Sequence, residues 1–235
     1  MKQTNVLLVE GHDDLHCLVG LIKAWAIPLT VTGRGRTLVE RDDAVALIEI
    51  REKGGWEKLR DTLDVELDAS DLQRLGILVD ANGHPDRRYQ SLQEFFQKHG
   101  YGDFPSKHDA LPAIVDHAGK PRIGIWLMPN NADSGTLEDF LRMLIPEPNT
   151  LWSRAETCVG SIPAEERLFS EPDRKKAVTH TYLAWQKQPG NPFGIAVSSG
   201  AFNPQAAAAQ KLRDWFTQLF MDPLPQLTAP PHPHQ

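Results

Sequence analysis

Three apolar segments of this sequence are each followed or closed by side chains that carry ligand oxygens. Glu10 follows the segment 5–9, Asp80 closes the segment 75–80, and a polar loop follows the segment 122–128. The adjoining loops and helix starts add further carboxylates and amides, at Asp13, Asp14, Asn82, Asn130, Asp133, Glu138 and Asp139. Carboxylates gathered at one sheet edge repel one another, and a hard divalent cation or a shared proton relieves the repulsion. These residues therefore predict a Mg²⁺ or Mn²⁺ site suited to phosphoryl transfer or phosphodiester hydrolysis.

The metal ligands predicted at this edge are Glu10, Asp14, Asp80, Asn82, Asp133 and Glu138. The alternative interpretation of Glu10 and Asp80 is structural, as carboxylates that cap the following helix or pair with arginine. For Asp13, Asp14, Glu138 and Asp139 the alternative is the ordinary preference for acids in the first turn of a helix. We expect the two strand-end acids to carry the function, because both follow segments too apolar to end in a carboxylate by chance.

Several cationic side chains are candidates for contacts to phosphate. They are Arg34 and Arg36 in the segment Gly33-Arg-Gly-Arg36, Arg87 and Arg88 after the segment that ends in Asp80, and the later pair Lys176 and His180. The alternative is solvated surface charge for the arginines and a partly buried structural role for the histidine. His12 and His16 have the spacing of two ligands on one helical face, but the sequence identifies no third zinc ligand.

Motifs of other enzyme classes are missing from the sequence. Gly33-Arg-Gly35 lacks the third glycine of a dinucleotide fingerprint, and there is no P-loop, GxSxG elbow or Cys/His nucleophile pair. The two cysteines, Cys17 and Cys158, form neither a CxxC motif nor a disulfide framework, which fits a reducing compartment. With no signal peptide and no long apolar run, we expect a soluble cytoplasmic protein without membrane contact.

The net charge limits the possible partners. The chain has 235 residues, with 25 Lys and Arg against 31 Asp and Glu, which gives a formal charge of −6. Binding of nucleic acid through bulk charge requires many cations that neutralise phosphates, so a coat protein is excluded. A local basic patch, and with it binding of nucleic acid, stays possible.

Alternating strands and helices are predicted up to about residue 150. Apolar runs predict strands over 5–10, 29–32, 44–50, 75–80 and 122–128, whereas apolar side chains at helical spacing predict helices over 15–22, 56–67, 87–98 and 137–144. This alternation favours an α/β protein with a mostly parallel sheet flanked by helices. We assign residues 1–150 to this core, 151–222 to a helical extension packed on it, and 223–235 to a proline-rich flexible tail.

The pattern of motifs resembles a known family. Glu10-Gly-x-Asp-Asp14 after a strand, a helix, and a later strand ending in Asp80-x-Asn82 resemble the Toprim domain of topoisomerases, bacterial primases and overcoming-lysogenization-defect nucleases. The chain as a whole, over roughly residues 5–221, looks like an uncharacterised prokaryotic family of Toprim-like proteins. That likeness rests on the segments Asp80–Leu92, Gly124–Asn131 with Gly135, Leu137–Phe140 and His180–Gln186.

The resemblance implies roles for particular residues. Toprim domains use the glutamate of the first strand as general acid or base or as a metal ligand, and a DxD pair for Mg²⁺, so Glu10 and Asp80 would be the catalytic residues. The implied activity is a nuclease, a hydrolase that works in genome defence beside a separate ATPase. Asn82 and Asn130 depart from the pattern, because an aspartate is expected at both positions and an amide ligand carries no charge.

Two other functions stay open. The departures at Asn82 and Asn130 favour a catalytically degenerate Toprim-like scaffold that binds nucleic acid or protein without cleaving it. The same acidic edge could also serve a phosphohydrolase that acts on small molecules. The sequence does not indicate the oligomeric state.

Overall fold

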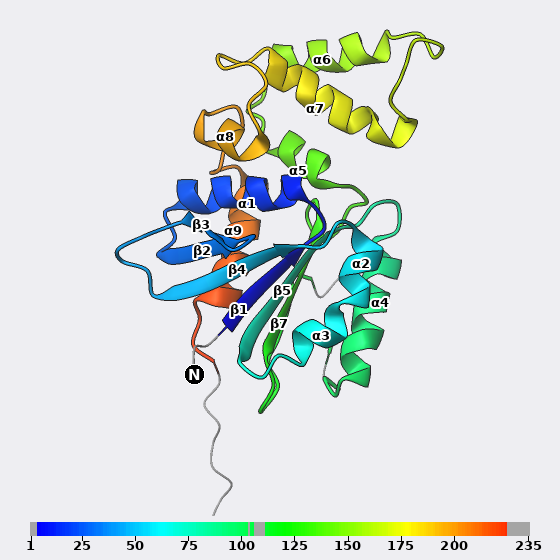
Figure 1. The fold of residues 1–235 in the computed structure, drawn as a ribbon. Coiled ribbons are helices and arrows are strands. Elements are labelled where there is room, and N and C mark those ends of the chain that lie inside the picture. The colour runs from blue at the N-terminus through cyan, green and yellow to red at the C-terminus, as the bar shows by residue number, and fades with distance from the viewer. Residues whose placement is uncertain (1–3, 103, 106–110, 225–235) are drawn as a thin grey trace, which may run out of the picture.

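A computed structural model describes residues 4–102, 104–105 and 111–224 of the chain. Within these residues, seven strands form one sheet in the order β3-β2-β4-β1-β5-β7-β6 (Figure 1). The strands are β1 (Thr4–Val9), β2 (Leu29–Gly33), β3 (Arg36–Val39), β4 (Ala46–Glu52), β5 (Leu72–Asp80), β6 (Ala113–Val115) and β7 (Arg122–Met128). The five strands β2, β4, β1, β5 and β7 run parallel, and the edge strands β3 and β6 are antiparallel to their neighbours. The predicted α/β class with a mostly parallel sheet is confirmed.

The register places β1 at the centre of the sheet. Val9, the last residue of β1, lies opposite Glu52 of β4 on one side and Leu78 of β5 on the other. Asp80 of β5 in turn lies opposite Met128 of β7. Because these strands are parallel, the residues that follow them all emerge at the same edge of the sheet.

Helices cover both faces of the sheet (Figure 1). Helices α2 (Trp56–Asp61), α3 (Leu63–Leu67) and α4 (Pro85–Lys98) lie on one face. Helices α1 (His12–Trp25), α5 (Leu137–Met143) and α9 (Ala207–Phe220) lie on the other, followed outward by α6 (Thr150–Gly160), α7 (Arg174–Ala184) and α8 (Phe193–Ser198). None of the described helices is long and apolar enough to cross a membrane.

Alternating side chains of β1 divide the apolar core into two parts. Val6 and Leu8 pack into the cluster under α2, α3 and α4, whereas Leu7 and Val9 pack into the larger cluster under α1 and the C-terminal helices. This period of two explains why a strand buried on both faces reads as a continuous apolar run.

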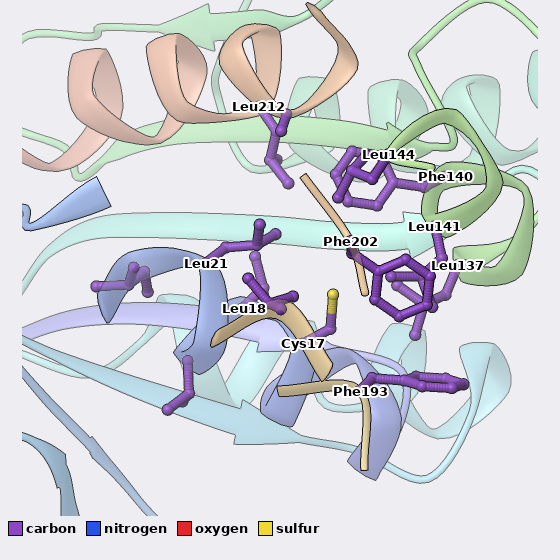
Figure 2. Close-up of a cluster of buried hydrophobic side chains, with 14 of the residues drawn as sticks. Cys17, Leu18, Leu21, Leu137, Phe140, Leu141, Leu144, Phe193, Phe202 and Leu212 are labelled. Atoms are coloured by element: carbon purple, nitrogen blue, oxygen red, sulfur yellow. The ribbon is translucent and has the colours of Figure 1, made fainter. Parts of the chain in front are cut away.

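The C-terminal helices complete the larger core. Figure 2 shows Leu18 and Leu21 of α1, Phe140 of α5 and Leu212 of α9 gathered in one cluster with Phe202 from the segment before α9, all of them buried. At the sheet, Gly76 and Gly124 lie opposite each other on β5 and β7, and a Cβ atom on Gly124 would come within 2.6 Å of Leu219. These glycines let α9 approach the strands closely.

Some elements differ from the predicted ones. The predicted helix over 56–67 is two short helices, α2 and α3, which meet at Thr62. The strands β3 and β6 and helix α8 were not predicted, and β4 extends two residues beyond the predicted end, to Glu52. The predicted tail begins at Pro223, and its residues 225–235 lie outside the described residues.

Candidate functional site

Glu10 lies directly after β1 and is held by the chain on both sides. Its carbonyl oxygen accepts hydrogen bonds from the backbone N–H groups of Gly54 at 2.8 Å and Gly55 at 2.9 Å, in the loop between β4 and α2. Its carboxylate Oε1 accepts a bond of 2.9 Å from the backbone N–H of Asp80. The glutamate is therefore fixed to β5 and to the loop that follows β4.

Asp80 ends β5 and points to the start of α5. Its Oδ1 accepts a hydrogen bond of 3.0 Å from the backbone N–H of Leu137, the first residue of that helix. The N–H groups of a first helical turn lack partners within the helix, so a carboxylate satisfies one of them and interacts favourably with the helix dipole. Asp80 thus connects β5 to α5 and places Glu138, the next residue of the helix, at the same edge.

Asp14 and Glu138 add two further carboxylates at this edge. The Oδ2 atom of Asp14 accepts a bond of 2.9 Å from the backbone N–H of Gly11, in the cap of α1. Glu138 accepts a bond of 2.7 Å from the hydroxyl of Thr136. We call Glu10, Asp14, Asp80 and Glu138 the acidic cluster.

The members of the acidic cluster interact electrostatically. Burial, and then the charges of Asp14, Glu10 and Glu138, raise the pKa of Asp80 to about 8 against the opposing hydrogen bond from Leu137. Burial and the charges of Glu10, Glu138 and Asp13 likewise raise the pKa of Asp14 to about 7. Without a cation, the cluster therefore retains protons at neutral pH, as expected for like charges held together.

Two backbone N–H groups and a nearby arginine partly offset the effect of burial on the pKa of Glu10. Burial raises the pKa of its carboxyl, whereas the N–H of Asp80, the charge of Arg88 and the N–H of Trp56 lower it. Arg88 is half-buried on α4, with its guanidinium carbon 4.2 Å from the centre of the Trp56 ring. Burial lowers the pKa of Arg88, and the charges of Glu10, Glu57 and Asp80 oppose that shift. Arg88 is thus a positioned cation beside the two strand-end acids.

The donor atoms suit a hard cation, but they are not arranged as a complete cage. Carboxylate oxygens are the ligands that Mg²⁺ and Mn²⁺ prefer. Over residues 4–102, 104–105 and 111–224, however, no three His, Cys, Asp or Glu side chains are grouped so that they could hold a metal ion. A cation here would need ligands from water or from a bound phosphate.

Asn82, a predicted metal ligand, is exposed and occupies a special backbone position. Its φ angle is 51°, in the left-handed region that asparagine tolerates better than most residues. Its backbone N–H donates to the carbonyl of Gly135 at 2.8 Å, which links the loop after β5 to the loop before α5. The backbone conformation thus accounts for a short polar residue here, either asparagine or aspartate.

Asn130 and Asp133 interact mainly with each other. The side-chain amide of Asn130 donates a bond of 2.7 Å to the carboxylate of Asp133. The Oδ1 atom of Asn130 accepts bonds from the backbone N–H groups of Ala132 at 3.1 Å and Asp133 at 2.9 Å. Asp133, another predicted metal ligand, is exposed in this turn and not within the acidic cluster.

The predicted phosphate-binding residues lie in two places. Arg88 adjoins Glu10 and Asp80, and its neighbour Arg87 is exposed on α4. The others are arranged around the first half of α1: Arg34 and Arg36 in the hairpin of β2 and β3, and Lys176 and His180 on α7. The amine of Lys176 contacts the carboxylate of Asp13 at 2.8 Å, and this hydrogen bond raises the pKa of the amine.

Glu52 is an acid at the same edge that the sequence argument missed. It ends β4 beside β1, forms an ion pair with Arg34 and contacts Nδ1 of His12 at 3.3 Å. The predicted strand stopped at residue 50, so its terminal acid fell outside the pattern that identified Glu10 and Asp80. A predicted strand that ended at residue 52 would have included Glu52 among the strand-end acids.

Comparison with known proteins places the chain in a family. The matching family model is described as a protein of unknown function (DUF3226), and it covers residues 4–221. No curated protein and no solved structure matches the chain. Because the matched segment spans most of the sequence, this chain belongs to the DUF3226 family.

Proposed function

We propose that this chain is a metal-dependent phosphodiesterase that acts on nucleic acid, in the manner of Toprim-domain nucleases. The observation that supports the proposal most is the pairing of Glu10 with Asp80. The two acids follow adjacent parallel strands and are joined through the Asp80 N–H group. A Toprim-type site requires a glutamate after the first strand and an aspartate after another strand at the same edge, which is where α/β sheets bind their ligands.

Mg²⁺ or Mn²⁺ would be held by Asp80, with Asp14 and Glu138 nearby and Glu10 beside it. Mg²⁺ is commonly bound by one or two protein carboxylates together with water and substrate phosphate, so the lack of a three-ligand group in the described residues does not conflict with such a cation. When bound, the cation would neutralise charge on the phosphate that reacts. The repulsion within the acidic cluster is the physical reason to expect a cation there.

The side chains themselves would supply positioning and proton transfer. Arg88, held against Trp56, would bind a phosphate oxygen and orient the phosphodiester over the two acids. Glu10 would accept the proton of the attacking water, because a carboxyl with a raised pKa is a better general base. The chain contains no P-loop, so a step driven by ATP would need a separate ATPase partner, and defence against foreign DNA is one setting for such a pair.

A second candidate is a degenerate Toprim-like scaffold that binds without cleaving. Two observations favour it: the uncharged amide of Asn82 where the Toprim pattern has a carboxylate, and the missing three-ligand group among the described residues. An amide in place of a carboxylate leaves the cation with less negative charge to bind.

The test is cleavage of plasmid, single-stranded DNA and RNA by the purified chain with Mg²⁺ or Mn²⁺. We expect Glu10→Gln to lower the rate by about a hundredfold or more, because an amide cannot take up the proton. The fold should persist, since the amide oxygen still accepts the N–H of Asp80. Glu94→Gln, which changes an exposed carboxylate on α4, is the matched control.

Two results would decide against the nuclease. Cleavage that Glu10→Gln leaves unchanged would come from another site or from a contaminant. An inert wild-type chain that gains cleavage upon Asn82→Asp would establish the scaffold, because only the missing carboxylate would then separate it from an active enzyme. Aspartate tolerates the left-handed conformation of position 82, so this variant should fold.

A further inference from the structure

Two cavities adjoin at the start of α1, and the larger one extends along the helix to Lys23. His12 and His16 line both of them. The smaller cavity, of about 360 Å³, lies between α1 and the β2–β3 hairpin, where Arg34 and Arg36 complete its wall. The larger, of about 560 Å³, lies between α1 and α8, and His180 of α7 also lines it. We call the two cavities together the α1 groove.

The α1 groove contains cations without carboxylate partners. Arg34 is neutralised by its ion pair with Glu52. In contrast, no described residue forms an ion pair with Arg36 in the smaller cavity or with Lys23 in the larger one. Unpaired cations at both ends of a concave surface attract an extended anion, and His12 and His16 supply hydrogen-bond donors between them.

The larger cavity also has an aromatic and apolar wall. The ring of His180 is exposed and stacks on Phe193, with 5.3 Å between ring centroids and 23° between the ring planes. Ile195, a residue that is 51% exposed, lies in the same wall. A flat exposed ring backed by a second ring offers a surface on which a nucleobase can stack.

The groove and the acidic cluster share one neighbourhood, the N-terminal end of α1. Asp13, which lines the larger cavity, precedes Asp14 in the sequence and pairs with Lys176. The charge of Glu138 also acts on Lys176. Nucleotides that extend past the N-terminal end of α1 would approach the acidic cluster, of which Asp14 is a member.

We propose that the α1 groove binds a single nucleic-acid strand, with backbone phosphates at Arg36 and Lys23 and a base on the ring of His180. The inference rests on the proposed function and narrows its substrate class. A single strand fits better than a duplex, because a duplex keeps its base faces stacked inside and cannot place one on a protein ring. Cations for the backbone combined with an aromatic platform are the usual features of single-strand binding sites.

The test measures binding separately from cleavage. Fluorescence anisotropy with the Glu10→Gln variant in EDTA compares a labelled single-stranded oligonucleotide, the same sequence as a duplex, and a mononucleotide. We expect the single strand to bind tightest.

Arg36→Ala should lower the slope of log K against log salt by about one. His180→Ala should weaken binding at least about fivefold, and His180→Phe should preserve it, because stacking requires only a flat ring. Arg154→Ala, an exposed arginine on α6, is the control.

Failure of the groove and failure of the nuclease give different results. Three results would overturn the proposal that the groove binds a single strand. They are tighter binding of the duplex, an affinity that does not depend on strand length, and equal affinity of wild type, Arg36→Ala and His180→Ala. If the groove variants lose affinity but the wild type cleaves nothing, the proposal of single-strand binding is supported and the nuclease proposal fails. If the wild type cleaves and the groove variants bind and cleave as it does, the nuclease stands and the groove is wrong.

Discussion

The backbone N–H of Asp80 donates a hydrogen bond of 2.9 Å to Oε1 of Glu10, so the acid that follows β1 is held by the strand that carries the second acid. Asp80 in turn uses Oδ1 to accept the N–H of Leu137 at the start of α5. These two bonds join β1, β5 and α5 at one edge of the sheet. Any change that alters the carboxylates but preserves their accepting oxygens should therefore affect charge more than structure.

Asp80→Asn should stabilise the metal-free protein at alkaline pH. The pKa of Asp80 in the folded state is about 8, far above that of an unfolded aspartate. The folded state thus keeps a proton that the unfolded chain has already lost, and its stability falls as pH rises toward and through 8. The amide cannot ionise, and its oxygen still accepts the N–H of Leu137. We expect a gain of about 1–2 kcal/mol above about pH 8.5 and little gain near pH 5 in urea unfolding.

The control for this variant is Asp214→Asn, an exposed aspartate on α9. Its stability should follow that of the wild type at each pH, since a substitution at an exposed surface position usually changes stability little. Parallel profiles for Asp80→Asn and the wild type would mean that Asp80 is ionised in the folded protein at neutral pH, contrary to its environment here.

Binding of Mn²⁺ should be stronger at higher pH. The cation must displace protons from Asp14 and Asp80, whose pKa values are about 7 and about 8. At a metal concentration about 100 times the dissociation constant, the stabilisation is about 2.7 kcal/mol. In a chain of this size that raises the melting temperature by roughly 5–10 °C. We expect this shift near pH 8.5, a much smaller one near pH 6, and almost none for Asp80→Asn. A shift of equal size at both pH values would count against binding by these carboxylates.

The central strands and the convergence of two acids could be predicted from the sequence. The apolar runs of β1, β5 and β7 are long enough to indicate buried parallel strands, and the acids at their ends then share an edge. The edge strands were missed for a physical reason. Only Val39 of the four residues of β3 is buried, and β6 has three residues, so neither forms a recognisable apolar pattern.

The details of the candidate site depended on tertiary structure. Asp133 looks equivalent to Asp80 in sequence, yet its carboxylate forms a local turn with Asn130. Arg34 looks like a free phosphate ligand, but it pairs with Glu52 from a neighbouring strand. His180 lines the same cavity as His12 and His16 only because α8 packs on α1, an arrangement that no local pattern encodes.

Gly20→Ala should separate α1 from α8 and destabilise the protein. A Cβ atom on Gly20 would lie 2.4 Å from the carbonyl oxygen of Gly194, and a Cβ on Gly194 would lie 2.3 Å from that of His16. Both contacts involve backbone atoms, so the helices themselves must move. Overpacking of this kind costs about 1–3 kcal/mol, measurable by urea unfolding. Gly83→Ala, where the added methyl meets no atom within 4 Å, should have little effect. Equal stabilities of the two variants would contradict the close approach of α1 and α8.

Arg88→Lys and Arg87→Lys form a matched pair that tests how the site binds phosphate. Arg88 is half-buried on the Trp56 ring beside Glu10, whereas Arg87 is exposed on the same helix. Lysine keeps the charge but loses the planar guanidinium, which can stack on the ring and bind two phosphate oxygens at once. We expect Arg88→Lys to lower kcat/KM for cleavage by about tenfold to a hundredfold and Arg87→Lys to leave it unchanged. Melting temperatures near that of the wild type would assign the loss to the site. If both variants cleave as the wild type does, charge alone is sufficient at position 88, and the stacked guanidinium does not orient the phosphate.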